Sequence, residues 1–262
     1  MPAVIIAGHQ RSGTTILGRV MAQHPQIGLT LEFANFQGLR RSIRHNIRLV
    51  ITRWRTVRLR DNFQPSSRLR STNFVRNNDT FVSLYLLGLL RSPWGLVELP
   101  TIERALRPLY PGASWMGDKY PDYVFQLDRL LTTQDLRCIV IYRDGRDVTS
   151  STLAQARTNW KNKHFVRDVD TAAKVATRWV GAIEIMERHH GRVHAIRYEN
   201  LVRDPQRELA AIAALLEIDP AGFPTDSIRQ DRVGKHRSGL TPEELETVTH
   251  IAGATMDRLG YD

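Results

Sequence analysis

A short segment near the N-terminus, Gly8 to Thr15 (Gly-His-Gln-Arg-Ser-Gly-Thr-Thr), has the residue types of an anion-binding loop. It follows the apolar, β-branched run Ala3–Ala7, which is typical of a buried parallel strand. Apolar residues at helical spacing then predict a helix from Thr14 to His24. In such a strand–loop–helix unit, the loop N–H groups and the positive end of the helix face an anion. We therefore expect this loop to bind a phosphate-like group.

The two glycines of the loop have the spacing of the nucleotide-binding P-loop, Gly-x-x-x-x-Gly-Lys-Ser/Thr. Thr14 stands where that loop has the lysine that reaches the β- and γ-phosphates. The cation lies inside the loop instead, as Arg11. The loop is thus suited to a shorter anion than a triphosphate. A glycine turn with only a structural role is the alternative.

A second anion site is expected after a buried strand from Arg137 to Tyr142. Arg143 follows this strand, and Ser151 comes eight residues later. A turn and two helical turns separate them, so both side chains can reach one anion near the helix start. A magnesium-dependent P-loop hydrolase would have a carboxylate where this strand ends in Arg143. The sequence therefore predicts phosphate binding without a metal.

Two further charged residues stand at the ends of predicted strands. Glu32 follows a strand expected from Gln26 to Thr30 and is the first acidic residue of the chain. Lys119 follows a strand expected from Ser114 to Gly117, and Pro121 after it suits the first turn of a helix. Sites in α/β proteins lie at the carboxyl ends of strands, so both residues are candidates for chemistry. An ordinary surface position is the alternative for each.

Together, these motifs resemble those of sulfotransferases that use 3′-phosphoadenosine 5′-phosphosulfate (PAPS). The first motif, Arg11-Ser12-Gly13-Thr14-Thr15-x-Leu17 followed by His24-Pro25, is similar to the donor-binding loop of that family. Its arginine resembles the form found in tyrosylprotein-type and bacterial members. The second motif is Arg143 with Ser151, in the family's order. The resemblance implies a P-loop-NTPase-like three-layer α/β fold, with a mostly parallel central sheet and helices on both faces. It implies sulfuryl transfer from PAPS to a hydroxyl, less often an amine, of a small molecule, glycan or lipid.

The resemblance also implies a role for each matching residue. Glu32 matches the glutamate that acts as the base, and His9 is the alternative base. Lys119 matches the lysine that reaches the bridging atoms of the donor, where Arg11 adds a second cation. Ten residues are expected to bind the donor: Arg11, Ser12, Gly13, Thr14, Thr15, Arg143, Ser151, Tyr198, Lys235 and Arg237. Arg143 and Ser151 would hold its 3′-phosphate and Tyr198 would lie near its adenosine, while no metal ligand is expected.

Lys235 and Arg237 belong to a polar, glycine-containing stretch from Gln230 to Leu240, which is expected to be a loop. Many family members have a basic loop near the C-terminus that closes over the 3′-phosphate. The tryptophan that is common in that loop is missing here.

The composition suits one domain with an insertion. The 262 residues, 42% of them hydrophobic, can bury one substantial core. No run of 18 apolar residues is present, so a membrane span is not expected. The first strand begins by residue 3, which leaves no room for a signal peptide. Cys138 is the single cysteine and lies in an apolar run, so it is expected to be a buried hydrophobe. A cytoplasmic enzyme fits these features.

The net charge of +10 points to an anionic partner. From Arg40 to Arg70 the chain has ten arginines and one acidic residue, Asp61. Apolar residues at steps of three and four predict an amphipathic basic helix within this stretch, at Ile43, Ile47, Val50, Ile51 and Trp54. Such a helix suits contact with nucleic acid, an anionic membrane surface or an acidic acceptor, and a solvated basic face is the alternative. Residues 36–112 are interpreted as an acceptor-side insertion, in which residues 62–78 form a loop.

The remaining elements complete an alternation of strands and helices, which predicts a parallel sheet covered on both faces. A long helix is expected from Asp168 to His190 and a strand from Val193 to Arg197. Another helix is expected to begin at Asp204-Pro205. Thr241 is expected to cap the last helix.

Two other functions are alternatives. A P-loop kinase or nucleotidase would need the missing loop lysine and a metal-binding carboxylate. A non-enzymatic protein that binds nucleic acid or an anionic membrane would explain the arginines but not two anion sites. No nucleic-acid partner is therefore expected.

Overall fold

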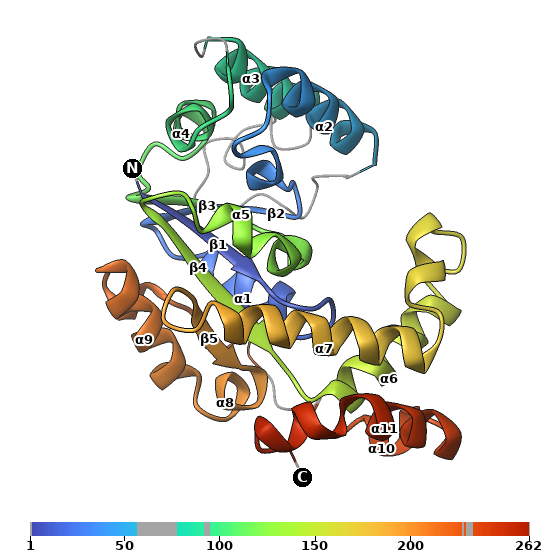
Figure 1. The fold of residues 1–262 in the computed structure, drawn as a ribbon. Coiled ribbons are helices and arrows are strands. Elements are labelled where there is room, and N and C mark those ends of the chain that lie inside the picture. The colour runs from blue at the N-terminus through green and yellow to red at the C-terminus, as the bar shows by residue number, and fades with distance from the viewer. Residues whose placement is uncertain (1, 57–77, 92–94, 227, 229–232, 262) are drawn as a thin grey trace.

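The computed structural model describes residues 2–56, 78–91, 95–226, 228 and 233–261. These residues form a five-stranded sheet in the order β2-β3-β1-β4-β5 (Figure 1). All four strand pairings are parallel. The strands are β1 (Ala3–Ala7), β2 (Ile27–Leu31), β3 (Trp115–Lys119), β4 (Leu136–Tyr142) and β5 (His194–Arg197). The predicted parallel α/β sheet is confirmed, with each strand within one or two residues of its expected bounds.

The sheet separates two apolar cores because alternate residues of each strand face opposite sides. Val4 and Ile6 of β1 pack on one side with three helices: α1 (Thr14–Met21), α8 (Tyr198–Arg203) and α9 (Pro205–Leu216). Ala3, Ile5 and Ala7 belong to the core on the other side. The arrangement is therefore helix–sheet–helix in three layers, as expected.

Most of the helices contribute buried residues to the core on the second side of the sheet. They are α2 (Ile43–Thr56), α3 (Asn78–Leu90), α4 (Leu99–Leu106), α5 (Leu127–Leu130), α6 (Gly145–Arg157), α7 (Ala172–Arg188) and α11 (Pro242–Arg258). The 3-10 turns are η1 (Asn35–Gly38), η4 (Arg107–Leu109), η5 (Pro121–Gln126), η6 (His164–Asp168) and η7 (Pro220–Gly222). Trp179 of α7 is the largest of the fully buried side chains.

The insertion contains the basic helix that the sequence predicts. In α2, Ile43 and Val50 are buried and Ile47 is half-buried, while Arg44 and Arg48 are exposed. The helices α2, α3 and α4 pack on one another and lie together at one end of the molecule (Figure 1). The side chains of Trp54 and Arg55 lie outside the described side chains. Residues 62–77 of the expected loop, together with Arg58, Arg60, Arg68 and Arg70, lie outside the described residues, and Asn78 begins α3.

The helices differ from the expectation in several places. The first helix, expected to reach His24, ends at Met21. The helix expected to begin at Asp168 begins at Ala172, because the hydroxyl of Thr171 accepts a hydrogen bond from Lys174 N and caps the helix there. Part of the stretch expected to be a loop is a short helix, α10 (His236–Gly239). The expected Thr241 cap is confirmed as a capping box with Glu244.

Within the described parts of the chain, no helix combines the length and the apolar character needed to cross a membrane.

Candidate active site

The glycine loop lies at the carboxyl end of β1, between its neighbours β3 and β4. Gly8 has a φ of +145°, and a Cβ there would lie 2.2 Å from the carbonyl oxygen of Ile141 in β4. Gly13 has a φ of +103°, and a Cβ there would lie 2.5 Å from Cδ2 of Tyr198. Only glycine fits at either position, so the loop is held close to β4 and to the Tyr198 ring.

The inside of the loop has unused hydrogen-bonding capacity. Ser12 is fully buried, and its Oγ has no hydrogen-bond partner among the described residues. The N–H groups of Thr14 and Thr15 stand in the first turn of α1, where a helix supplies no internal acceptor. An oxygen-rich anion would satisfy these donors, so the residues present fit a phosphate or phosphosulfate group.

The two predicted anion sites are in direct contact. Arg11 Nε donates to Ser151 Oγ of α6 at 2.9 Å. Arg143 is buried, donates to Asp147 Oδ2 at 2.7 Å, and its Cζ lies 4.6 Å from the centre of the Tyr198 ring. Ser151 was expected to share an anion with Arg143, and its hydroxyl accepts from Arg11. Arg143 precedes α6, whereas Ser151 lies six residues after the first residue of α6, Gly145, about 9 Å along the helix axis.

Lys119 and Glu32 meet beside the first turn of α1. The ammonium of Lys119, whose side chain is 1% exposed, donates to Glu32 Oε1 and to Thr15 Oγ1, the latter at 3.3 Å. The Glu32 side chain is 50% exposed. In this ion pair, the lysine is therefore buried and the glutamate faces solvent. A cation and a carboxylate thus stand together at the ends of β3 and β2, as the strand-end argument anticipated.

The C-terminal segment is attached to the same helix start by Asp147, which the sequence interpretation missed. Asp147 accepts from Gly234 N at 2.8 Å, from His236 N at 2.9 Å and from the His236 ring at 2.8 Å. Burial alone would raise the pKa of Asp147, but the Arg143 charge and the hydrogen bonds from His236 and Arg143 outweigh it and lower the pKa. The four-residue spacing from Arg143 was a signal for this ion pair.

Lys235 and Arg237 stand on either side of His236, and both side chains are exposed. The hydrogen bonds to Asp147 therefore bring their backbone to the start of α6. Among the described residues, neither side chain makes a hydrogen bond or an ion pair with the glycine loop.

His9, the alternative base, is buried within the loop. Its Nδ1 donates to the carbonyl oxygen of Gln10 at 2.7 Å, and its Nε2 has no partner among the described residues. Burial lowers the pKa of His9 to about 4; the Gln10 carbonyl acts in the opposite direction and the Arg178 charge adds to the lowering. His9 is therefore neutral at pH 7. A pKa this far below neutrality makes it a weak base.

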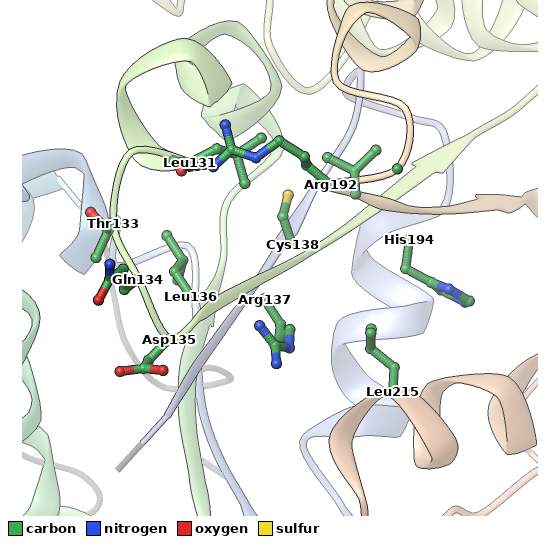
Figure 2. Close-up of a pocket in the computed structure, with 12 residues that line it drawn as sticks. Leu131, Thr133, Gln134, Asp135, Leu136, Arg137, Cys138, Arg192, His194 and Leu215 are labelled. Atoms are coloured by element: carbon green, nitrogen blue, oxygen red, sulfur yellow. Dashed lines mark hydrogen bonds between the residues drawn. The ribbon is translucent and has the colours of Figure 1, made fainter.

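A cavity of about 690 Å³ lies elsewhere, at the amino ends of β4 and β5 (Figure 2). Figure 2 shows Cys138 and Arg192 on one side of β4, and His194 and Leu215 on the other. The glycine loop follows the carboxyl end of β1. The cavity therefore lies at the other end of the parallel strands. None of the predicted site residues lines it. Among the described residues, no three His, Cys, Asp or Glu side chains are grouped as a metal ion would require.

Comparisons with known proteins show the family and the fold of the chain. A family model described as "Sulfotransferase family" matches residues 2–221. No curated protein matches the chain significantly in sequence. Among solved structures, a sulfotransferase domain of the Synechococcus PCC 7002 olefin synthase is 17% identical, with a TM-score of 0.59 and coverage of 96% of this chain and 94% of that one.

Two other solved structures are similar to the whole chain. Sulfotransferase STF9 from Mycobacterium avium is 16% identical, with a TM-score of 0.55, covering 100% of this chain and 77% of its own. Mouse sulfotransferase SULT7A1, solved in complex with PAP, is 15% identical, with a TM-score of 0.50, covering 98% and 85%. At these identities, the likenesses show the fold.

Proposed function

The chain belongs to the sulfotransferase family, and we propose that it transfers a sulfuryl group from PAPS to an acceptor hydroxyl, or less often an amine. The observation that carries this proposal is the hydrogen bond from Arg11 to Ser151. It joins the loop after β1 to the helix after β4, so one ligand with an anion at each end can occupy both sites. PAPS has this form, and the mouse relative was solved with PAP, its desulfated product.

The donor would be held from both ends. The loop residues Arg11, Ser12, Gly13, Thr14 and Thr15 would bind the 5′-phosphosulfate through side chains and N–H groups. Arg143 and Ser151 would bind the 3′-phosphate, and Tyr198, which contacts both Arg143 and the Gly13 region, would lie near the adenosine. Lys235 and Arg237 would approach the 3′-phosphate because Asp147 attaches their segment to α6. We propose that none of these contacts requires a metal.

The reaction would proceed by attack of the acceptor oxygen on sulfur. A bond forms between that oxygen and sulfur, the bond from sulfur to the 5′-phosphate oxygen breaks, and PAP leaves with the electron pair. Glu32 would take the proton of the acceptor hydroxyl. Its position beside Lys119 supports this role, because Lys119 can meet the bridging oxygen while Glu32 meets the acceptor. The neutral, buried His9 is a weaker candidate.

Charge develops on the leaving phosphate oxygen as the sulfur–oxygen bond breaks. Arg11, Lys119 and the N–H groups at the start of α1 would stabilise this charge. These groups are held by Ser151, Thr15 and the helix itself, so little reorganisation is needed during the reaction.

Acceptor recognition would belong to residues 36–112, the insertion of what we propose is a single domain. Arg53 of α2 supports this assignment because its Cζ lies 4.6 Å from the ring centre of Tyr120, the residue after Lys119. The acceptor would be a hydroxylated small molecule, glycan or lipid, and the basic stretch from residue 40 to 60 could bring the protein to an anionic membrane surface. The single, buried Cys138 suits a reducing compartment, so a cytoplasmic location is proposed.

A screen by mass spectrometry tests this function. The protein is incubated with PAPS and a panel of hydroxylated metabolites, and each mixture is searched for a sulfated product formed together with PAP. A parallel panel contains ATP and magnesium. Phosphorylated products in the second panel, with no sulfated product in the first, would overturn the proposal in favour of a kinase.

A further inference from the structure

Asp118 is a fully buried carboxylate immediately before Lys119 in β3. It accepts three hydrogen bonds from three different elements. Thr30 Oγ1 of β2 donates to Oδ1 at 2.6 Å, while Ala34 N and the Tyr123 hydroxyl of η5 donate to Oδ2 at 2.8 Å and 2.7 Å. The donor-binding contacts described above do not involve this carboxylate. Two of its partners, Thr30 and Ala34, lie on either side of Glu32 in the chain, and the third, Tyr123, belongs to η5.

The backbone around Glu32 has an unfavourable conformation that needs such support. Glu32 has a φ of 67° and Ala34 a φ of 64°, the left-handed region that side-chain-bearing residues seldom adopt. Glu32 N donates to Lys119 O at 2.7 Å, so the turn is fixed on one side by the backbone of β3. Asp118 fixes the other side through Ala34 N. Glu32 therefore lies between two hydrogen bonds made by consecutive residues of β3.

The same group of side chains supports the residues that follow. Asn35 Nδ2 donates to Thr30 Oγ1 at 2.7 Å, and Phe36 N donates to the Tyr123 hydroxyl at 2.9 Å. Burial and the nearby Asp118 raise the pKa of Tyr123 well above its ordinary value, so its hydroxyl keeps its proton and remains a donor. Burial raises the pKa of Asp118 too, against the effect of its three donors and Lys119.

We propose that Asp118 is a positioning residue for the transfer reaction: its carboxylate holds the turn at residues 32–36 so that the Glu32 side chain meets Lys119 at the acceptor side. This inference rests on the proposed role of Glu32 as the base. It assigns Asp118 no contact with the donor or the acceptor. The effect on turnover would pass entirely through Glu32, and this separates a positioning role from a general contribution to folding.

The substitution Asp118→Asn keeps the volume but replaces an oxygen acceptor by a donor. Amide hydrogen exchange should then become faster in a peptide covering residues 31–37, where Ala34 N and Phe36 N lie, and stay unchanged over residues 8–15 and 143–151. Asp128→Asn is the matched control, since Asp128 is a largely exposed carboxylate that contacts Arg188 and His189. If Asp118→Asn leaves exchange over 31–37 unchanged, the carboxylate does not hold the turn and the proposal is wrong.

A double-substitution cycle tests the link to chemistry. The probe is PAPS alone, for which water is the acceptor and the products are sulfate and PAP. Asp118→Asn should slow the hydrolysis of PAPS to sulfate and PAP about 10- to 100-fold, the size expected for a small displacement of a reacting group. Its affinity for PAP should stay within about twofold. In a Glu32→Gln background, the same substitution should change the rate less than about threefold.

Two outcomes distinguish the positioning role of Asp118 from the role of Glu32 on which it rests. If Glu32→Gln alone leaves the rate of PAPS hydrolysis unchanged, Glu32 is not the base. The base assignment and the positioning role of Asp118 then both fail. Glu32→Gln could instead slow PAPS hydrolysis while the effects of the two substitutions on the rate multiply. Asp118 would then act independently of Glu32, and only the positioning role would fail. Should Asp118→Asn not fold, Tyr123→Phe is the second variant; it removes one donor to Asp118 and the acceptor of Phe36 N, and should show the same pattern at smaller size.

Discussion

Arg11 donates to Ser151 although 140 residues separate them in the chain. The contact joins the loop after β1 to the helix after β4, two segments that the central position of β1 in the sheet brings together. Each residue belongs to a different sequence motif. The two motifs are therefore in direct contact, and this supports the proposal that one donor with phosphates at both ends binds to both of them.

Donor binding should need no metal. PAP should raise the free energy of unfolding by about 4 kcal/mol at a thousandfold excess over its dissociation constant, because it binds only the folded state. Thermal unfolding with magnesium and with a chelator should give the same stabilisation. Loss of the stabilisation in chelator would instead favour a metal-dependent nucleotide enzyme.

Arg143 should recognise the 3′-phosphate. Arg143→Ala should weaken PAP binding by about 2 kcal/mol, as expected for a charge-assisted hydrogen bond to phosphate. Binding of adenosine 5′-phosphosulfate, which lacks the 3′-phosphate, should hardly change in the same calorimetric titration. Arg146→Ala is the control, because Arg146 is a nearby arginine in the first turn of α6 and contacts Asp144. Equal losses for both ligands would mean that Arg143 acts on the fold.

Substitutions of Glu32 and of Arg11 should have different effects on turnover and on donor binding. Glu32→Gln should lower turnover by roughly two to four orders of magnitude, the usual contribution of a positioned base, and leave PAP affinity nearly unchanged. Arg11→Ala should damage both, since the same cation would meet the bound phosphosulfate and the developing charge. The measurement is steady-state turnover beside PAP titration. Near-normal turnover in Glu32→Gln, with turnover lost in His9→Ala, would transfer the base assignment to His9.

His9 should make stability depend on pH. Its pKa is lowered from 6.5 to about 4 in the folded state, so between these values the unfolded chain binds a proton that the folded chain does not. Stability should therefore fall as pH decreases from 6.5 to 4, by up to about 3 kcal/mol from this residue. The free energy of unfolding, measured with urea at several pH values, should depend less on pH in His9→Gln than in the unchanged protein. Identical slopes would mean that His9 does not remain neutral when buried.

Contiguous signals made much of this structure predictable. The runs Ala3–Ala7 and Cys138–Ile141 are continuous and apolar because both are buried on two faces, and each is followed by the residues of an anion site. Such features depend on neighbours in sequence. The capping of the last helix by Thr241 was predictable for the same reason.

Asp118 and Asp147 were missed as structural partners because their contacts are distant in sequence. Ala34 lies 84 residues from Asp118, and Gly234 lies 87 residues from Asp147. One sequence contains no sign of which distant N–H group a carboxylate accepts from. The hydrogen bond from Arg11 to Ser151, across 140 residues, was not predictable for the same reason.

The arginines on α2 have a consequence for the protein as a charged body. Residues 36–112 contain 14 arginines and four acidic residues, a formal charge of +10, and the rest of the chain has 23 basic and 23 acidic residues. The net charge of this one segment thus equals that of the whole protein. Anionic molecules would be drawn toward the segment from beyond contact distance, and added salt would slow their arrival without changing a single contact.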